Sequence, residues 1–206
     1  MNCITNAVSQ RYITFLKKQG VYITDTDYIN AWVSWDSMGN RAKSGLAKTV
    51  VLQLHEMSKR VDIGTPVFRL LNLVVSKNGS KHAMCFVLTE IEDNKYILEI
   101  FDSNGLMVDN GKYPLDTFVL NLTALVASKY ASEYKCKVKA VQTRGGKNNP
   151  NLNTIGEGNC DALMLYYIAL RSKHTMSDTN AILDSSPMNL KRIKTINEAI
   201  IKKKSF

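Results

Sequence analysis

The residue best placed to act as a nucleophile is Cys160, in the stretch "GEGNCDALMLYYIAL" (156–170). Small and polar residues precede this cysteine and apolar residues at helical spacing follow it, so Cys160 is predicted to stand at a helix N-terminus. The positive end of a helix favours the thiolate, which is the reactive form of a cysteine. Cys3 is terminal, and Cys85 and Cys136 fall in predicted strands, so inert thiols are expected at these three positions.

A nucleophilic thiol needs a base, and the candidate is His82, which opens an apolar strand directly after the turn "KNGSK". Asp102 ends the next predicted strand, in "IFDSNG". In a tight antiparallel hairpin the first residue of one strand lies opposite the last residue of the next, so we expect His82 and Asp102 side by side. The carboxylate would hold the imidazole in the tautomer that leaves its other nitrogen to accept the thiol proton.

Gln142 ends a later strand, before the long loop "TRGGKNNPNLNTIGEGN" (143–159) that leads to Cys160. An amide side chain at this place can donate a hydrogen bond to a developing oxyanion, a role worth roughly 2.7–4 kcal/mol in enzymes. A loop of this length inside a compact domain is typical of a functional or mobile segment. The sequence thus predicts a nucleophile, a base, an orienting acid and an oxyanion donor.

The elements that must position these residues follow from the spacing of the apolar side chains. Helices are predicted over 5–19, over a short segment that carries Trp32 and Trp35, and over 44–58, 114–134, 160–172 and 188–203. Strands are predicted over 67–75, 82–91, 95–102 and 136–142. The first three strands are separated by short turns, which indicates an antiparallel meander.

These elements predict an α+β fold with an antiparallel or mixed central sheet, flanked by helices, and with the cysteine at a helix N-terminus. The sheet would consist of the meander over about 67–102 and the strand 136–142. Neither a repeat nor a convincing linker divides the chain, so a single domain over 1–206 is expected. Its N-terminal part (1–65) would be helical, and a basic helix (187–206) would close it.

Composition excludes several classes of protein. With 206 residues and 45% hydrophobic residues the chain can bury a sizeable core. The longest apolar runs fall far short of the ~20 residues that span a bilayer, and the N-terminus does not resemble a signal peptide, so an intracellular protein without a membrane partner is expected.

Four scattered cysteines without a CxxC pair, and only three histidines, argue against a disulfide framework and a metal site. No cofactor is therefore expected.

The net charge of +9 favours polyanionic partners, above all nucleic acid. The basic residues gather in short clusters at 17–18, 59–60, 144–147, 191–192 and 202–204. A basic nucleic-acid-binding or capsid-associated protein without enzymatic activity is therefore one alternative. DNA bound at this surface as an activator of an enzyme is another.

Taken in order, "HAMCFVLTEI", "YILEIFDSNG", "VKAVQ" and "GNCDALMLYYI" resemble the clan of cysteine proteases that includes the adenovirus maturation protease, adenain, and the SUMO- and ubiquitin-like-specific proteases. The resemblance covers about 67–172 and rests on the chain order His, Asp, Gln, Cys. It implies a cysteine endopeptidase in which Cys160 is the nucleophile, His82 the general base, Asp102 its orienting residue and Gln142 the oxyanion donor. It also implies precursor proteins of a virus particle as substrates, cleaved in the cytoplasm or nucleus of a host cell or in the virion.

Two features depart from the pattern of this clan. Asp161 follows the cysteine where the clan usually has glycine, and an acid beside a thiolate raises the pKa of that thiol. The gap between Gln142 and Cys160 is also longer than usual, so a backbone N–H of residues 156–160 could share the oxyanion role.

Other activities remain open alongside a maturation protease. One is removal of ubiquitin or SUMO by an enzyme of the same clan, and another is acetyl transfer from acetyl-CoA by effector enzymes that use the same His, acid, Cys order. "GNC" also resembles the cysteine box of ovarian-tumour-type deubiquitinases. Their histidine lies far beyond the cysteine, whereas here only His174 follows. Trp32 and Trp35 are interpreted as core residues, or as the wall of a substrate groove.

Overall fold

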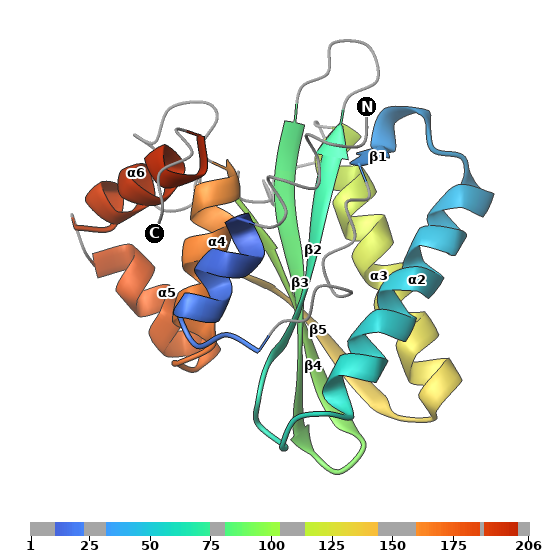
Figure 1. The fold of residues 1–206 in the computed structure, drawn as a ribbon. Coiled ribbons are helices and arrows are strands. Elements are labelled where there is room, and N and C mark those ends of the chain that lie inside the picture. Colours follow the sequence, from blue (N-terminus) through green and yellow to red (C-terminus); the bar gives the residue numbers. More distant parts are fainter. Residues whose placement is uncertain are drawn as a thin grey trace.

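The computed structural model describes residues 11–22, 32–74, 81–103, 114–143, 160–185 and 188–201. At its centre lies a five-stranded sheet with the order β1-β2-β3-β4-β5 (Figure 1). Strands β2 (Val67–Val74), β3 (Lys81–Glu92) and β4 (Lys95–Asp102) form the predicted antiparallel meander. Strands β1 (Trp32–Ser34) and β5 (Lys137–Thr143) pair in parallel with β2 and β4. The prediction of an α+β fold with a mixed sheet is confirmed.

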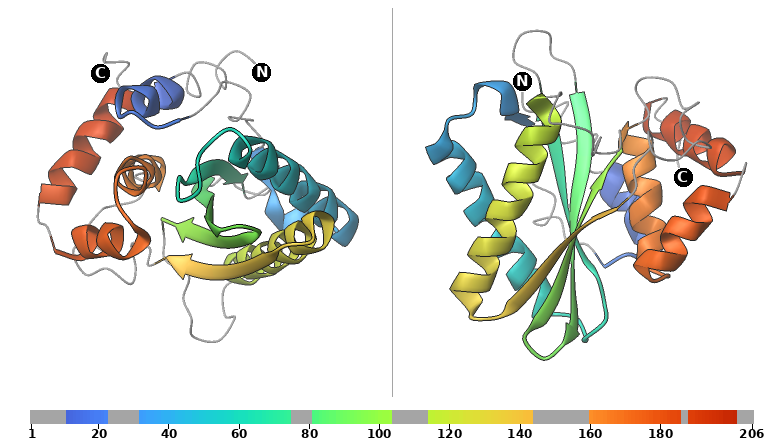
Figure 2. Two further views of the ribbon diagram at one scale, coloured as in Figure 1. Left: turned by 90° about the horizontal axis from the view of Figure 1, so that it is seen from below. Right: turned by 180° about the vertical axis from the view of Figure 1, so that it is seen from behind.

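Helices cover both faces of this sheet (Figures 1 and 2). One face carries α2 (Asn40–Ser58) and α3 (Pro114–Tyr134), and the other carries α4 (Cys160–Arg171). An outer layer packs against α4, and it consists of the helical residues 11–18, α5 (Met176–Ser185) and α6 (Met188–Ile201). Helix α4 is therefore enclosed between the sheet and this layer.

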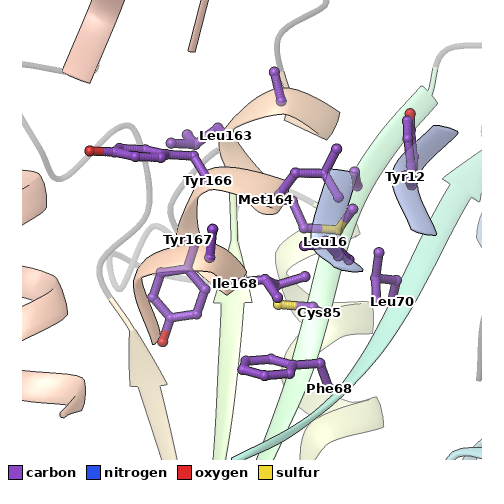
Figure 3. Close-up of a cluster of buried hydrophobic side chains, with 14 of the residues drawn as sticks. Tyr12, Leu16, Phe68, Leu70, Cys85, Leu163, Met164, Tyr166, Tyr167 and Ile168 are labelled. Carbon is purple, nitrogen blue, oxygen red and sulfur yellow. The ribbon is translucent and has the colours of Figure 1, made fainter. Parts of the chain in front are cut away.

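The two cores explain why the central strands are apolar at nearly every position. In β3, Met84 and Phe86 pack with α2 and α3, while Cys85 and Val87 pack with α4. A strand buried on both faces has no wet side, so it loses the usual alternation of polar and apolar residues. Figure 3 shows the α4 core, to which the N-terminal segment contributes Tyr12 and Leu16, β2 contributes Phe68 and Leu70, and α4 contributes Leu163, Met164, Tyr166, Tyr167 and Ile168.

A buried ion pair fixes α4 along the sheet. Arg171, at the end of α4, places its guanidinium around the Glu99 carboxylate of β4, with Nη2 2.6 Å from Oε1 and Nε 3.1 Å from Oε2. Tyr167 donates to the same carboxylate at 2.9 Å, and Arg171 also donates to the Thr89 hydroxyl of β3 at 3.2 Å. Glu99 is completely buried, so its charge is satisfied entirely by these side chains. This ion pair fixes the position of α4 along the sheet, and it therefore determines at which end of the sheet Cys160 lies.

One secondary-structure prediction is wrong, and one helix was not predicted. Residues Trp32–Ser34 form β1 and Trp35–Ser37 a 3-10 turn, because pairing with the edge of β2 overrides the helical pattern there. The side chains of Trp32 and Trp35 lie outside the described part of the structure, as do residues 144–159 of the long loop. Helix α5 was not predicted, although Thr175 caps it: Thr175 Oγ1 accepts from the Asp178 N–H at 3.1 Å and donates to the Asp178 carboxylate at 2.7 Å.

None of the helices that the structure describes combines the length and the apolar character needed to cross a bilayer.

Candidate active site

The site begins with a buried hydrogen bond between His82 of β3 and Asp102 of β4. Nε2 of the imidazole lies 2.8 Å from Oδ1 of the carboxylate, and the two residues are 7% and 1% exposed. Because an ionised carboxylate only accepts hydrogen bonds, this contact places a proton on Nε2 and makes Nδ1 the proton-accepting nitrogen. That is the tautomer a thiol base requires.

The predicted direct opposition of these residues in the sheet is wrong in detail. Met84 lies opposite Asp102, and His82 lies opposite Leu73 of β2. The strands run further into the turn than the sequence suggested, which leaves only residues 93–94 between them, and a bulge between Glu90 and Glu92 shifts the register. His82 and Asp102 are diagonal neighbours on one face, and a side chain of this length reaches across such a diagonal.

Cys160 is the first residue of α4, as predicted, and its partly buried side chain packs against the α4 core. Burial, and after it the charge of Asp161, raises the pKa of its thiol to about 11. Backbone hydrogen bonds of Ala83, Asp161 and Cys160 itself lower the pKa and offset part of this effect. The thiol is therefore protonated at neutral pH. It lies near Ala83, the residue that follows His82 in the chain.

The thiol and the histidine belong to opposite faces of the sheet. The register places His82 and Asp102 on the face covered by α2 and α3, since their strand partners Leu73 and Met84 belong to that core. Cys160 belongs to the helix on the other face.

The spacing of contacts along α4 supports this placement. Its last residue, Arg171, donates to Thr89, and its first, Cys160, lies close enough to Ala83 for the Ala83 backbone to lower the pKa of the thiol. A helix of 12 residues spans about 18 Å and six strand residues about 20 Å, so α4 runs alongside β3 from one contact to the other.

Gln142 lies on β5, level with Ile100 of β4, and its side chain is exposed. The register puts it on the same sheet face as Asp102, two residues short of the end of β4. The described contacts do not bring it to Cys160, and its role as an oxyanion donor stays a prediction. The backbone N–H groups of Cys160 and Asp161, in the first turn of α4, are further possible donors because the first N–H groups of a helix have no partner within it.

Within the described residues, no three His, Cys, Asp or Glu side chains gather closely enough to hold a metal ion.

An open hollow of about 670 Å³ lies at the other end of the sheet, lined by residues 64–66, Thr89, Ile91, Ile97 and 171–177. Arg171, one of the basic residues that line it, is paired with Glu99. The lining of this hollow includes His174 but neither a cysteine nor a carboxylate, so the His82 end of the sheet is the better candidate for chemistry.

Sequence reasoning missed Ser103, whose buried hydroxyl donates to the Ala83 carbonyl at 3.0 Å. In "IFDSNG" this serine reads as a turn residue. A correct strand register would have revealed it, because position 103 faces Ala83 when Met84 is opposite Asp102.

Comparison with solved structures finds a protein with a similar fold. No protein-family model matches the sequence, and a search of curated proteins finds no match. Among solved structures, the chain is similar to the effector protein RavZ of Legionella pneumophila, with 11% identity and a TM-score of 0.51. The match covers 82% of this chain and 48% of the RavZ chain, so it corresponds to about half of that protein. The likeness establishes that this arrangement of sheet and helices also occurs in a bacterial effector protein.

Proposed function

We propose that this chain is a cysteine peptidase, with Cys160 as the nucleophile, His82 as the general base and Asp102 as the residue that orients His82. The observation that carries the proposal is the buried hydrogen bond between His82 and Asp102, next to a thiol at a helix N-terminus. A buried histidine–carboxylate pair costs desolvation free energy, and such pairs beside a nucleophile are typical of acid–base catalysis.

The thiol pKa determines how the first step must proceed. With a pKa of about 11, only about one thiol in 10,000 is ionised at pH 7, so a preformed thiolate carries little of the reaction. Nδ1 of His82 takes the thiol proton as the sulfur attacks the substrate carbonyl, and Asp102 stabilises the resulting imidazolium.

The remaining steps return the enzyme to its starting state. The imidazolium gives its proton to the leaving amine, the C–N bond breaks, and a thioester on Cys160 remains. His82 then takes a proton from water, the hydroxide attacks the thioester, and the sulfur leaves and regains the proton. The backbone N–H groups of Cys160 and Asp161, with Gln142 as in the clan that the sequence resembles, would stabilise each oxyanion.

Protein substrates are part of this proposal. The resemblance to adenain makes precursor proteins of a virus particle the first substrates to test, and the net charge of +9 makes DNA the first activator to test. Acetyl transfer and removal of ubiquitin-like proteins use the same three residues and are separated by product analysis.

The test compares the wild type with Cys160→Ala, His82→Ala and Cys136→Ser, the last being a matched control at another partly buried cysteine. Each protein is incubated with a denatured cell-protein mixture, with and without DNA, and new N-termini are identified by mass spectrometry. We expect new N-termini only with the wild type and Cys136→Ser. Cleavage that persists in Cys160→Ala contradicts the proposal. Acetylation from labelled acetyl-CoA without cleavage would assign the transferase activity instead.

A further inference from the structure

The open hollow of about 670 Å³ lies at the end of the sheet away from Cys160. It is lined by residues 64–66 before β2, by residues 171–177 from the end of α4 to the start of α5, and by Thr89, Ile91 and Ile97 of the sheet. Its volume falls within the range of about 300–1,000 Å³ that is usual for ligand pockets. Arg171 is the last residue of α4 and Cys160 the first, so the hollow begins about 18 Å from the candidate nucleophile. A ligand held there leaves the proposed catalytic residues free.

Hydrogen bonds fix both segments of the hollow to their surroundings. The Gly64 N–H donates to the Glu90 carbonyl of β3 at 2.7 Å. Gly64 has a φ of +91°, which favours glycine at this position. In the other segment, Arg171 donates to the Thr89 hydroxyl at 3.2 Å and to the His174 carbonyl at 3.0 Å. The hollow is therefore formed before a ligand binds, which lowers the entropy cost of binding.

The surface of the hollow is partly apolar. Ile91 of β3 lines it and is 52% exposed, and Ile63 is 60% exposed. The hydrogen bond between Gly64 and Glu90 brings the segments that carry these two isoleucines together. Ile97 of β4 also lines the hollow. Apolar surface gains free energy when a partner removes it from water, so the hollow favours a ligand with apolar groups.

Basic side chains border this apolar surface. Lys173 and His174 line the hollow and are exposed. Lys139 of β5 lies opposite Ile97 in the parallel ladder, so its exposed side chain projects from the same face of the sheet. Among the described residues, neither Lys139 nor Lys173 forms an ion pair. Both lysines can therefore pair with a ligand.

The carboxylates of neighbouring described segments do not neutralise these lysines. Glu92 lies 2.7 Å from Lys95, and Asp178 accepts from Thr175 Oγ1 at 2.7 Å. Asp62 precedes the 64–66 segment but is not part of the lining. The described lining contains no carboxylate, so the ligand with complementary charge is an anion.

We propose that this hollow is a docking site for an extended acidic segment of a protein substrate, whose carboxylates pair with Lys139 and Lys173 while an apolar side chain covers Ile91. The inference rests on the proposed function, because a docked segment would hold the substrate chain near Cys160. Proteins bind the bases of single-stranded nucleic acid by stacking them on aromatic side chains, and the described lining contains no Phe, Tyr or Trp. The hollow therefore favours a peptide over nucleic acid.

The distance to Cys160 gives the proposal a geometric requirement. An extended chain rises about 3.3 Å per residue, so about six residues are needed to span the 18 Å length of α4. The acidic segment must therefore lie at least about six residues from the scissile bond.

The first measurement is the binding of a fluorescein-labelled peptide to the full chain carrying Cys160→Ala, followed by fluorescence anisotropy. The peptide has aspartates around two leucines, and a second peptide has lysines in place of the aspartates. The variants add Lys139→Glu, Lys173→Glu or Ile91→Ser. The matched controls are Lys48→Glu and Leu52→Ser, because both residues are exposed on α2, which packs on the opposite face of the sheet.

We expect the Kd of the acidic peptide to rise about threefold for each lysine reversal and about tenfold for Ile91→Ser. Lys48→Glu and Leu52→Ser should leave the Kd unchanged, and the lysine peptide should not bind. An equal loss in Lys48→Glu would assign the affinity to net charge and overturn the inference. Tighter binding of a single-stranded oligonucleotide than of the acidic peptide, with the same loss in Ile91→Ser, would also overturn it.

The second measurement separates docking from catalysis. A peptide that the wild type cleaves is made with and without the acidic segment, on a linker of about six or about two residues. We expect the segment on the longer linker to lower KM about tenfold at unchanged kcat, and Ile91→Ser to remove this gain. The short linker should give no gain.

The two measurements distinguish failure of docking from failure of the proposed function. If the acidic peptide binds in the hollow but Cys160 cleaves nothing, the proposed function is wrong and the hollow remains a docking site for an acidic protein partner. If cleavage depends on Cys160 while the acidic segment never lowers KM, the proposed function stands and the docking site is overturned.

Discussion

His82 and Asp102 are diagonal neighbours across the end of the β3–β4 hairpin, and a 2.8 Å hydrogen bond joins Nε2 to Oδ1. The diagonal leaves Met84 opposite the carboxylate, so an apolar side chain borders it within the sheet. A carboxylate that is 1% exposed has little water around it, and the imidazole becomes one of its main partners. The tautomer of His82 therefore depends on the charge of Asp102.

Replacing Asp102 by Asn tests this dependence. The amide keeps the shape of the side chain but can donate to Nε2, which would move the ring proton to Nδ1 and remove the base. We expect kcat for peptide cleavage to fall by about 10³–10⁴, as in enzymes with the corresponding change. Asp62→Asn, at an exposed position, is the control and should keep full activity. Asp102→Asn activity within tenfold of the wild type would contradict the role of this residue.

Replacing Asp161 by Asn should make Cys160 more reactive. The Asp161 charge raises the pKa of the thiol, so its removal lowers the pKa and increases the thiolate fraction at every pH below it. The alkylation rate of Cys160 at pH 7 should rise, and loss of an acid from the first turn of α4 should cost about 0.3–1 kcal/mol of stability. Asp178→Asn, in the first turn of α5, is the matched control. Slower alkylation of Cys160 in Asp161→Asn would show that a property of Asp161 other than its charge controls the reactivity of the thiol.

The parts of the molecule that the sequence predicted well are those with a strong local signal. The strands of the meander, α3 and the start of α4 at Cys160 follow from apolar runs and clear boundaries. Register was predicted less well, because a two-residue difference depends on the turn at 93–94 and the bulge beside it. Ser103 and the parallel pairing of β1 depend on contacts between distant segments, which no local pattern contains.

The ion pair of Glu99 and Arg171 should be essential for stability. Arg171→Met leaves the carboxylate of Glu99 buried, and the Tyr167 hydroxyl is then its one remaining donor among those described. Removal of one partner of a buried ion pair typically costs about 3–5 kcal/mol of stability. Urea unfolding followed by circular dichroism measures the change. Lys59→Met is the control, because its pair with Glu56 is exposed at the surface and should contribute little. A loss for Arg171→Met as small as that for Lys59→Met would contradict the anchoring of α4 by this pair.

His55 should make the fold less stable in acid. Its ring stacks on Tyr134 with a centroid separation of 3.4 Å, and burial together with Lys59 lowers its pKa below the usual 6.5. The unfolded chain therefore binds a proton more readily than the folded one, so this contribution to stability is complete above about pH 6.5 and is lost as the pH falls from there through the lower pKa of the folded state. We expect the melting temperature of the wild type to fall more between pH 7.5 and pH 5 than that of His55→Phe, which keeps a stacking ring but does not titrate. Leu52→Phe, on the exposed side of the same helix, controls for an added ring. Equal pH dependence in the wild type and His55→Phe would assign the acid sensitivity to other groups.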